Sequence, residues 1–486
     1  MKFHRHPYFP LSPKRYPGCL ALLLFFTSCN KAIDVGMPPT EIVAGSAFNS
    51  DGGAESVLAG LYVQLAQDGF TYGEFGLSIM MGLYADELGC YNNVSPIDKA
   101  FCKDSLTSQS DADEFYWGLI YKLLYTCNTA IEGLTPSLAG VSPAIRQQLL
   151  GEAKFVRAFL DFYATNLYGD IPLPLTTDYV TNDTLSRIPQ QLVYQQITRD
   201  LRDAQGLLSD GSYLNGTGEP TTGRLRPNKQ AASALLARVR LYQQDWPDAE
   251  AQSTSVINTP QYVLEQDLNR VFLITTREAI WQLQPVGMEA APDAYYLIPA
   301  ASPLGNIQFL LDNPLIAAFE QGDLRLSDWI GQYISPAGPS GPADTMYYAY
   351  KYKANNIYTA STVEYPVILR LAEQYLIRAE ARTQRGNIQG AQADLNTIRI
   401  RAGLPPASAA TRDDLLTAIA HERQVELFTE WGHRWFDLKR SGHADSVMSI
   451  VSPQKGAGAW NTNKQLLPIP STEIVLNPHL TQNPGY

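Results

Sequence analysis

The chain has 486 residues, a formal net charge of −11 at pH 7, 45% hydrophobic residues and 17% charged residues. This composition is typical of a globular protein and excludes a disordered one, and the length is sufficient for a large core or several domains. The acidic charge also argues against a nucleic-acid-binding protein, because contacts to phosphate need clustered Lys and Arg side chains.

The N-terminal segment has the order of a secretory leader. Basic residues precede a short apolar run, residues 19–26, which ends just before Thr27, Ser28 and Cys29. The run is too short to span a bilayer, and a cysteine at this point favours a lipoprotein signal. We therefore expect residues 1–28 to be a signal peptide, Cys29 to carry lipid and residues 29–50 to be a tether. The alternative is an ordinary exported leader in which Cys29 stands by chance.

Five cysteines are present, and two of them belong to this leader region. Cys19 would leave with the signal peptide and Cys29 would be acylated, so Cys90, Cys102 and Cys127 remain. Cys90 and Cys102 flank one loop and could form a disulfide after export, or they could stay reduced and buried. Their spacing is not that of a zinc site, and we expect no metal and no cofactor.

Hydrophobic periodicity predicts a mainly α-helical chain. The predicted helices cover residues 148–168, 228–243, 248–257, 370–385, 388–402 and 415–438. The first of them ends at Gly169, and Pro172 prevents its resumption. Residues 228–257 and 370–402 each read as two helices joined by a tight turn, with small residues at similar offsets. This pattern is typical of degenerate tetratricopeptide-like hairpins.

Long stretches rich in Gly, Pro, Ser and Asn separate these helices. They cover residues 208–226, 284–305 and 333–362, and connections of this length are usually functional. Short strands are expected near residues 279–283 and 363–369. No second domain is evident, so residues 51–486 are predicted to form one body.

Five sequence blocks resemble the SusD/RagB family of nutrient-binding outer-membrane lipoproteins. They are residues 151–159 (GEAKFVRAF) with 167–172 (LYGDIP), residues 226–239 (RPNKQAASALLARV), residues 369–381 (LRLAEQYLIRAEA), residues 422–427 (ERQVEL) with 434–440 (RWFDLKR), and the terminal residues 467–470 (LPIP) with 482–486 (QNPGY). Any one block is a weak signal. All five occur in the order of the family, from about residue 149 to the last residue.

The resemblance implies a SusD-like helical body with tetratricopeptide-like hairpins and long ligand-binding loops. It also implies a lipid-anchored, surface-exposed position on the outer membrane and a partner, a SusC-like TonB-dependent β-barrel transporter. In that arrangement the lipoprotein covers the barrel, captures oligosaccharides, or peptides in some members, and releases them inward.

The shared blocks also carry interleaved charges. These are Glu422, Arg423, Glu426, Arg434, Asp437 and Arg440, which recur at helical spacing. Arg–carboxylate pairs of this kind can orient one helix against another at a fixed angle, so we interpret the charges as structural rather than as a binding site.

The sequence contains no complete catalytic motif. His421 and Glu422 begin like a zinc-protease motif, but Val425 stands where the second ligand histidine is required. Asp86 and Glu87 form a carboxylate pair after an apolar run, and we interpret them as helix-end carboxylates that cap or pair. A glycosidase needs two carboxyls facing each other across a bond, which adjacency in sequence does not provide.

A ligand site on the loops is the remaining hypothesis, because a sugar stacks on aromatic rings and its hydroxyls need polar partners at the rim. Four loop groups meet this requirement: Phe70, Tyr72 and Glu74; Asp86, Tyr91, Asn92 and Asn93; Tyr295 and Tyr296; and Tyr347, Tyr348 and Tyr350. The candidate ligand-binding residues are Tyr72, Asp86, Tyr91, Asn92, Tyr295, Tyr296 and Tyr347. The alternative for each is packing in the core or contact with the barrel.

The sequence therefore predicts a non-catalytic protein that captures glycans at the cell surface for a transporter. Three alternatives stay open at this point. One is a peptide-binding member of the same family, another is a surface glycoside hydrolase that uses Asp86 or Glu87, and the last is a scaffold that binds only protein.

Overall fold

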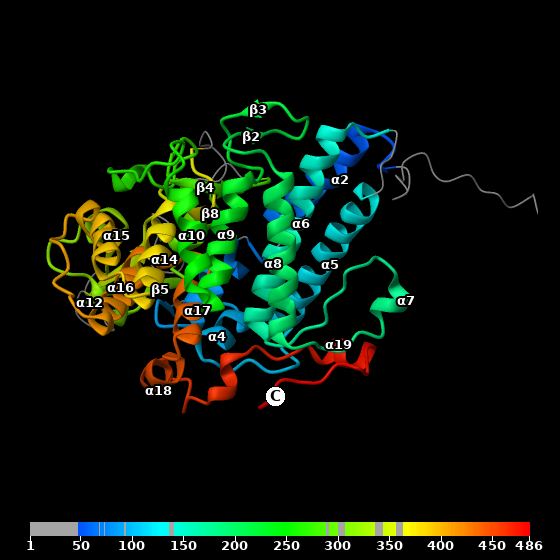
Figure 1. Ribbon diagram of the computed structural model, residues 1–486. Helices are drawn as coiled ribbons and strands as arrows, with labels where there is room; N and C mark the ends of the chain where they lie inside the picture. The colour runs from blue at the N-terminus through cyan, green and yellow to red at the C-terminus, as the bar shows by residue number, and fades with distance from the viewer. Residues whose placement is uncertain are drawn as a thin grey trace, which may run out of the picture. The chain divides into compact units, whose positions relative to one another are not determined.

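The computed structural model describes residues 47–67, 69–71, 73–91, 94–135, 140–287, 291–299, 307–335, 344–355 and 363–486. Helices predominate in these residues, and the strands form two-stranded antiparallel sheets (Figure 1). The predicted fold class, a mainly α-helical body with minor β-structure, is confirmed. Among the described residues, no helix combines the length and apolar composition that a membrane span needs.

Long helices packed side by side form the body. They are α2 (Asp51–Gln67), α5 (Asp111–Leu134), α6 (Pro143–Tyr168), α8 (Gln190–Leu207), α9 (Lys229–Tyr242), α10 (Trp246–Ile257), α14 (Leu371–Gln384), α15 (Ile388–Arg401) and α16 (Arg412–Glu426). From α5 to α10 each of these helices packs against the next, and α14 continues the row against α10 (Figure 1). The row arises because each helix has an apolar stripe that only a neighbouring helix can cover.

The two predicted hairpins are confirmed as α9 with α10 and α14 with α15. Asn228 caps α9 by accepting a hydrogen bond from the Ala231 amide at 2.9 Å, and Asn387 caps α15 by accepting one from the Gly390 amide at 3.0 Å. The helix predicted over residues 148–168 begins earlier, at Pro143, because proline is well suited to a first turn. It ends at Gly169 as predicted.

The helix predicted over residues 415–438 is wrong, because the chain breaks it into α16 and α17 (His433–Arg440). In the turn between them Thr429, Trp431 and Gly432 have φ values of 51°, 50° and 70°. Tertiary contacts stabilise this turn, although the apolar periodicity of residues 415–438 favours one continuous helix. Lys351 Nζ donates to the carbonyls of Glu426 and Phe428, both at 2.8 Å, where α16 ends.

The strands lie in the long connections. β1 (Leu88–Cys90) pairs with β5 (Phe309–Leu311), β2 (Tyr213–Leu214) with β3 (Pro220–Thr221), β4 (Ala279–Gln282) with β8 (Val367–Arg370), and β6 (Ile330–Ser335) with β7 (Asp344–Ala349). The predicted strands near residues 279–283 and 363–369 are confirmed as β4 and β8.

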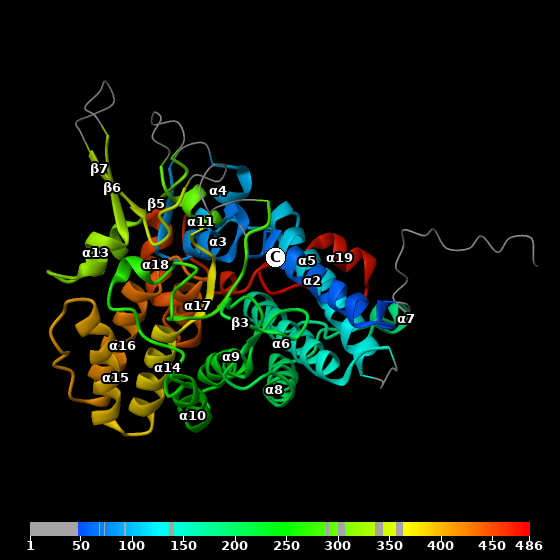
Figure 2. The same cartoon turned by 90° about the horizontal axis from the view of Figure 1, so that it is seen from above.

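Short helices complete the described structure. They are η1 (Gly73–Phe75), α3 (Leu77–Tyr84), α4 (Pro96–Cys102), α7 (Tyr179–Asn182), η2 (Leu268–Arg270), α11 (Pro292–Leu297), α12 (Asn313–Ala318), α13 (Leu324–Asp328), α18 (Ala444–Gln454), η4 (Thr462–Gln465) and α19 (Ser471–Leu476). Viewed from above, α11, β5, β6 and β7 gather on one side, and α5, α7 and α19 gather on another (Figure 2).

A buried ion network lies in the C-terminal half of the chain. Its members are Arg325, Arg370, Arg399, Arg401 and Lys351 with Asp323, Glu278, Glu320, Glu422, Glu426 and Glu430. Each of the interleaved charges of the shared blocks, including those outside this network, forms an ion pair. The pairing that the structural interpretation predicts is therefore present for all six charges.

The last residues fold back on the body. Asn483 is buried and its side-chain amide donates to the carbonyls of Tyr168 at 2.9 Å and Leu467 at 2.7 Å. Cys90, Cys102 and Cys127 are free thiols, so the alternative without a disulfide holds in this structure.

Candidate functional site

The predicted loop groups lie on elements that contact one another. The Tyr91 amide donates to the Gln308 carbonyl at 2.8 Å, which joins the end of β1 to the start of β5. β7 packs beside β5, and α11 packs against both β5 and η1. Segments that are distant in sequence therefore meet in one region (Figure 2).

Two adjacent tyrosines of α11 define the centre of this region. The rings of Tyr295 and Tyr296 have centroids 4.9 Å apart and are nearly perpendicular. Tyr296 lies against Gly73, since a Cβ added there would stand 2.9 Å from Tyr296 Cε2. Gly73 has φ +70°, so a glycine serves both the turn and the close approach of the ring.

Polar groups accompany these rings. Gln308 Nε2 donates to Glu74 Oε1 at 3.5 Å. Burial, together with the neighbouring Asp98 carboxyl, raises the pKa of Glu74 to about 7. A carboxyl with this pKa is protonated in a large fraction of molecules at neutral pH, so it can donate as well as accept a hydrogen bond.

The tyrosine run occupies β7. Tyr347 is half-buried against the core, whereas the ring of Tyr348 lies across Gly331 of β6, where an added Cβ would stand 2.1 Å from Tyr348 Cζ. Successive strand residues point to opposite faces, so Tyr347 and Tyr348 serve different surfaces. We name Tyr91, Tyr295, Tyr296 and Tyr347 the tyrosine face.

The remaining predicted site residues have other positions. Tyr91 and Tyr295 are 39% and 44% exposed, whereas Asp86 is only 2% exposed. Arg434 Nε and Nη2 donate to the two carboxylate oxygens of Asp86 at 2.7 and 2.6 Å. This is the helix-end pairing expected for Asp86, and it leaves no oxygen directed at a surface ligand. Cys29, Tyr72 and Asn92 lie outside the described residues.

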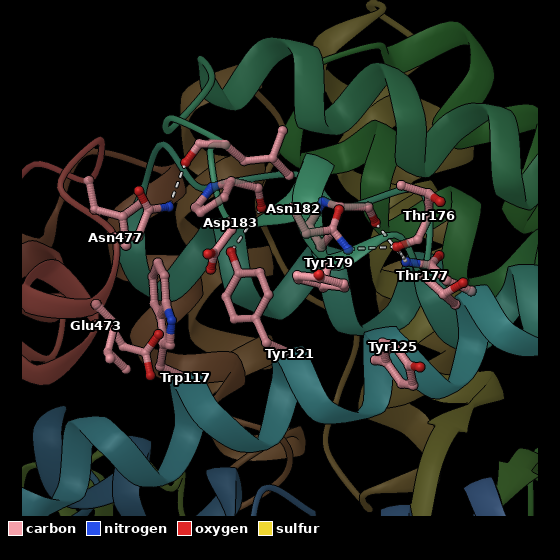
Figure 3. A pocket seen from close by; sticks show the side chains of 16 residues that line it. Trp117, Tyr121, Tyr125, Thr176, Thr177, Tyr179, Asn182, Asp183, Glu473 and Asn477 are labelled. Atoms are coloured by element: carbon pink, nitrogen blue, oxygen red, sulfur yellow. Dashed lines mark hydrogen bonds between the residues drawn. The ribbon is translucent and has the colours of Figure 1, made fainter. Parts of the chain in front are cut away.

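An aromatic pocket that sequence reasoning missed lies elsewhere on the body. Its volume is about 360 Å³. It is bounded by α5, by the connection from α6 through α7, and by α19 (Figure 3). Trp117, Tyr121 and Tyr125 form one side, and Tyr179 faces them. We call this cavity the aromatic pocket.

Direct hydrogen bonds hold the walls of this pocket in place. Tyr121 Oη donates to the Pro172 carbonyl at 2.8 Å, and Asn128 Nδ2 donates to the Pro174 carbonyl at 2.9 Å. Both hydrogen bonds attach the connection between α6 and α7 to α5. Asn477 Nδ2 donates to the Leu185 carbonyl at 2.9 Å and thereby ties α19 to the α7 segment. The pocket is therefore preformed.

A sequence signal for the pocket exists. Trp117, Tyr121 and Tyr125 are spaced by four residues, which places them on one face of a helix. The same spacing is typical of aromatic residues that fill a core. Only the exposure of Tyr125 and Tyr179, 55% and 78%, distinguishes the two cases, and exposure comes from the fold.

The carboxylates considered for catalysis are buried. Glu87 is 1% exposed, and burial together with the charge of Asp86 raises its pKa to about 8. Its Oε2 accepts from the Thr429 amide at 3.3 Å. Within the described ranges, no group of His, Cys, Asp or Glu is arranged to hold a metal ion.

The fold is thus a row of packed helices that includes two helical hairpins and has aromatic side chains on its connections. Two family models match this chain: "SusD family" over residues 325–486, and "Starch-binding associating with outer membrane" over residues 46–241. The chain belongs to the SusD/RagB family.

Similar proteins agree with this assignment. SusD-like protein P2 of Formosa agariphila is 25% identical, over 96% of this chain and 98% of its own. A SusD superfamily protein of Bacteroides vulgatus has a TM-score of 0.77 at 22% identity, covering 90% of this chain and 99% of its own. A laminarin-binding SusD-like protein has a TM-score of 0.74 at 23% identity, covering 89% and 99%. These structural similarities establish the fold.

Proposed function

We propose that this protein binds glycans at its tyrosine face without cleaving them. The observation that carries the proposal is the convergence of η1, β1, α11 and β7, which brings the predicted tyrosines into one region. Support also comes from the starch-binding description of one matching family model and from the laminarin-binding protein of the same fold.

The chemistry of the face suits a sugar. A pyranose presents apolar C–H faces, which stack on tyrosine rings, and hydroxyl groups, which need partners at the edge of the rings. Tyr91 and Tyr295 provide exposed rings, and Glu74 and Gln308 provide polar groups beside them. The burial of Asp86 and Glu87 supports binding without catalysis, because neither carboxyl is positioned to reach a surface-bound glycosidic bond.

The proposal extends to the position of the protein and to its partner. Lipid on Cys29 would hold the body of residues 51–486 on the outer membrane, with residues 29–50 as the tether. There the protein would deliver glycan to a SusC-like TonB-dependent transporter. Replacing Cys29 with Ala should release the protein from membranes, and antibody labelling of intact cells should detect the lipidated form at the surface. Copurification of a β-barrel transporter with the lipidated form would support the partnership.

Calorimetric titration tests the binding function. The full chain, secreted with Cys29→Ser so that it stays in solution, is titrated with neutral oligosaccharides, acidic oligosaccharides and peptides. Tyr295→Ala should weaken glycan binding about tenfold, or 1.4 kcal/mol, whereas Tyr295→Phe should retain it because the ring remains. Product analysis accompanies each titration.

Two results would contradict the proposal. Cleavage of any glycan in the panel would show that the protein is an enzyme. Binding of peptides with no binding of glycans would assign it to the peptide-binding alternative.

A further inference from the structure

The aromatic pocket has the shape of a binding site that opens in one direction. Along α5 the exposed fraction rises from 3% at Trp117 to 55% at Tyr125, with the half-buried Tyr121 between them. The rings of Trp117 and Tyr121 have centroids 4.8 Å apart at a tilt of 39°. The pocket is therefore closed by indole at one end and open at the other, with an aromatic row along its side (Figure 3).

The members of the row are four residues apart, which corresponds to about 6 Å along the helix axis. This interval is close to the length of one pyranose residue in a glycan chain, so neighbouring sugars could meet neighbouring rings. The opposite wall presents Tyr179 at the first position of α7, where the Asp178 side chain accepts from the Val180 amide at 3.2 Å and sets the start of the helix. A ligand between the two walls would contact aromatic rings on both sides.

Polar groups of the pocket favour a neutral ligand with hydroxyl groups. None of the sixteen described residues that line it is Lys, Arg or His, whereas Asp183 and Glu473 contribute carboxylates. An anionic sugar would be repelled by these charges. Asn182 Nδ2 donates to the Thr176 carbonyl at 2.8 Å, which fixes this amide at the wall of the pocket.

We propose that the aromatic pocket is a second glycan site, selective for neutral sugars and independent of the tyrosine face. The two sites share no residue and are built on different elements. The volume of the pocket lies within the range of small-molecule sites, roughly 300 to 1,000 Å³. The ligand class rests on the proposed function, and the location and the charge preference rest on the pocket itself.

Exposed aliphatic side chains at the edge of the pocket are consistent with this assignment. Val475 and Leu476 of α19 are 81% and 73% exposed, and Leu476 lines the cavity. Aliphatic side chains can cover the C–H faces of a sugar that protrudes from the row. A protein partner could also cover them, but the concave and preformed shape favours a small ligand.

The test combines calorimetry with hydrogen exchange on the full chain, secreted with Cys29→Ser. Neutral gluco-oligosaccharides should protect the backbone amides of residues 176–185 and 471–480 from exchange. The double substitution Tyr125→Ala with Tyr179→Ala should abolish this protection and weaken one class of sites about tenfold. Both side chains are exposed, so the fold should persist, and the matched pair Tyr125→Phe with Tyr179→Phe should bind as the wild type does.

The outcomes separate this inference from the proposed function. Protection at the pocket that persists in Tyr295→Ala would establish the second site. Glycan binding that depends on Tyr295, without protection at the pocket of the wild-type protein, would overturn the inference and leave the proposed function intact. Protection by uronate-containing oligosaccharides equal to that by neutral ones would overturn the charge preference. Absence of binding by every glycan would overturn both proposals.

Discussion

Glu426 is the carboxylate on which the buried ion network depends most. It is fully buried, accepts from Arg370 Nη1 at 2.6 Å and Arg325 Nη1 at 2.9 Å, and also contacts Arg401. Burial alone would raise its pKa, but the three guanidinium groups hold that pKa well below the usual value. Glu426→Gln should lower the free energy of unfolding by about 3 to 5 kcal/mol, because buried arginines then lose a shared counter-charge and face an amide donor.

Urea denaturation of wild type and variant at pH 7 measures this effect. The matched control is Glu320→Gln, which removes a charge from the edge of the same network, 2.6 Å from Arg399 and with Glu320 40% exposed. The control substitution should lower the free energy of unfolding by less than about 1 kcal/mol, because solvent screens the partly exposed ion pair of Glu320 with Arg399. The folded-state pKa of Glu426 lies below its unfolded value, so its contribution should be complete above about pH 4.5 and should be lost as the pH falls further. Equal effects of the two substitutions at pH 7 would refute the reasoning.

Three further predictions concern the loops around the tyrosine face. Glu87→Gln should stabilise the protein increasingly as the pH rises from 4.5 to about 8, by on the order of 1 kcal/mol per pH unit, as measured by urea denaturation. The reason is that folded wild-type protein holds a proton on Glu87 that the unfolded chain releases. A stability difference independent of pH would contradict this. Gly73→Ala should reduce glycan affinity in calorimetry at least tenfold, because a Cβ at φ +70° would displace Tyr296, and unchanged affinity would remove Tyr296 from the site. Asp86→Asn should lower the free energy of unfolding by about 3 kcal/mol because it weakens the ion pair with Arg434. The glycan affinity of the folded protein should not change. A loss of affinity would show that Asp86 contributes to ligand binding.

Two helical hairpins could be predicted from the sequence with accurate bounds, whereas the long helices α2, α5 and α8 were not predicted. The hairpins over residues 228–257 and 370–402 combine apolar periodicity with Asn caps and tight turns, and the structure reproduces their bounds within two residues. The break within residues 415–438 could not be predicted, because its cause lies far away in the chain. Lys351 donates hydrogen bonds to the carbonyls at the end of α16, and no local sequence pattern predicts that contact.

Prediction of the candidate sites had a similar limit. Composition and loop position pointed to Tyr91, Tyr295 and Tyr347, and the structure places them on neighbouring elements. The aromatic pocket was missed because Trp117 and Tyr121 lie on a helix, where aromatic residues usually fill the core. Three elements distant in sequence form that pocket, so only the tertiary structure shows which face of α5 stays open.

The turn over residues 427–432 links the ion network to the tyrosine face. Lys351, just beyond β7, donates to Glu430 Oε1 at 2.5 Å within the turn. Asp86 and Glu87, just before β1, are held by Arg434 and by the Thr429 amide. β1 and β7 are thus each fixed at one end to buried charges. Tyr91 directly follows the other end of β1 and is 39% exposed, whereas Tyr347 lies within β7 and is half-buried. Buried ion pairs contribute little net stability but fix geometry, so at this position they hold the adjoining ends of β1 and β7 in place on the body.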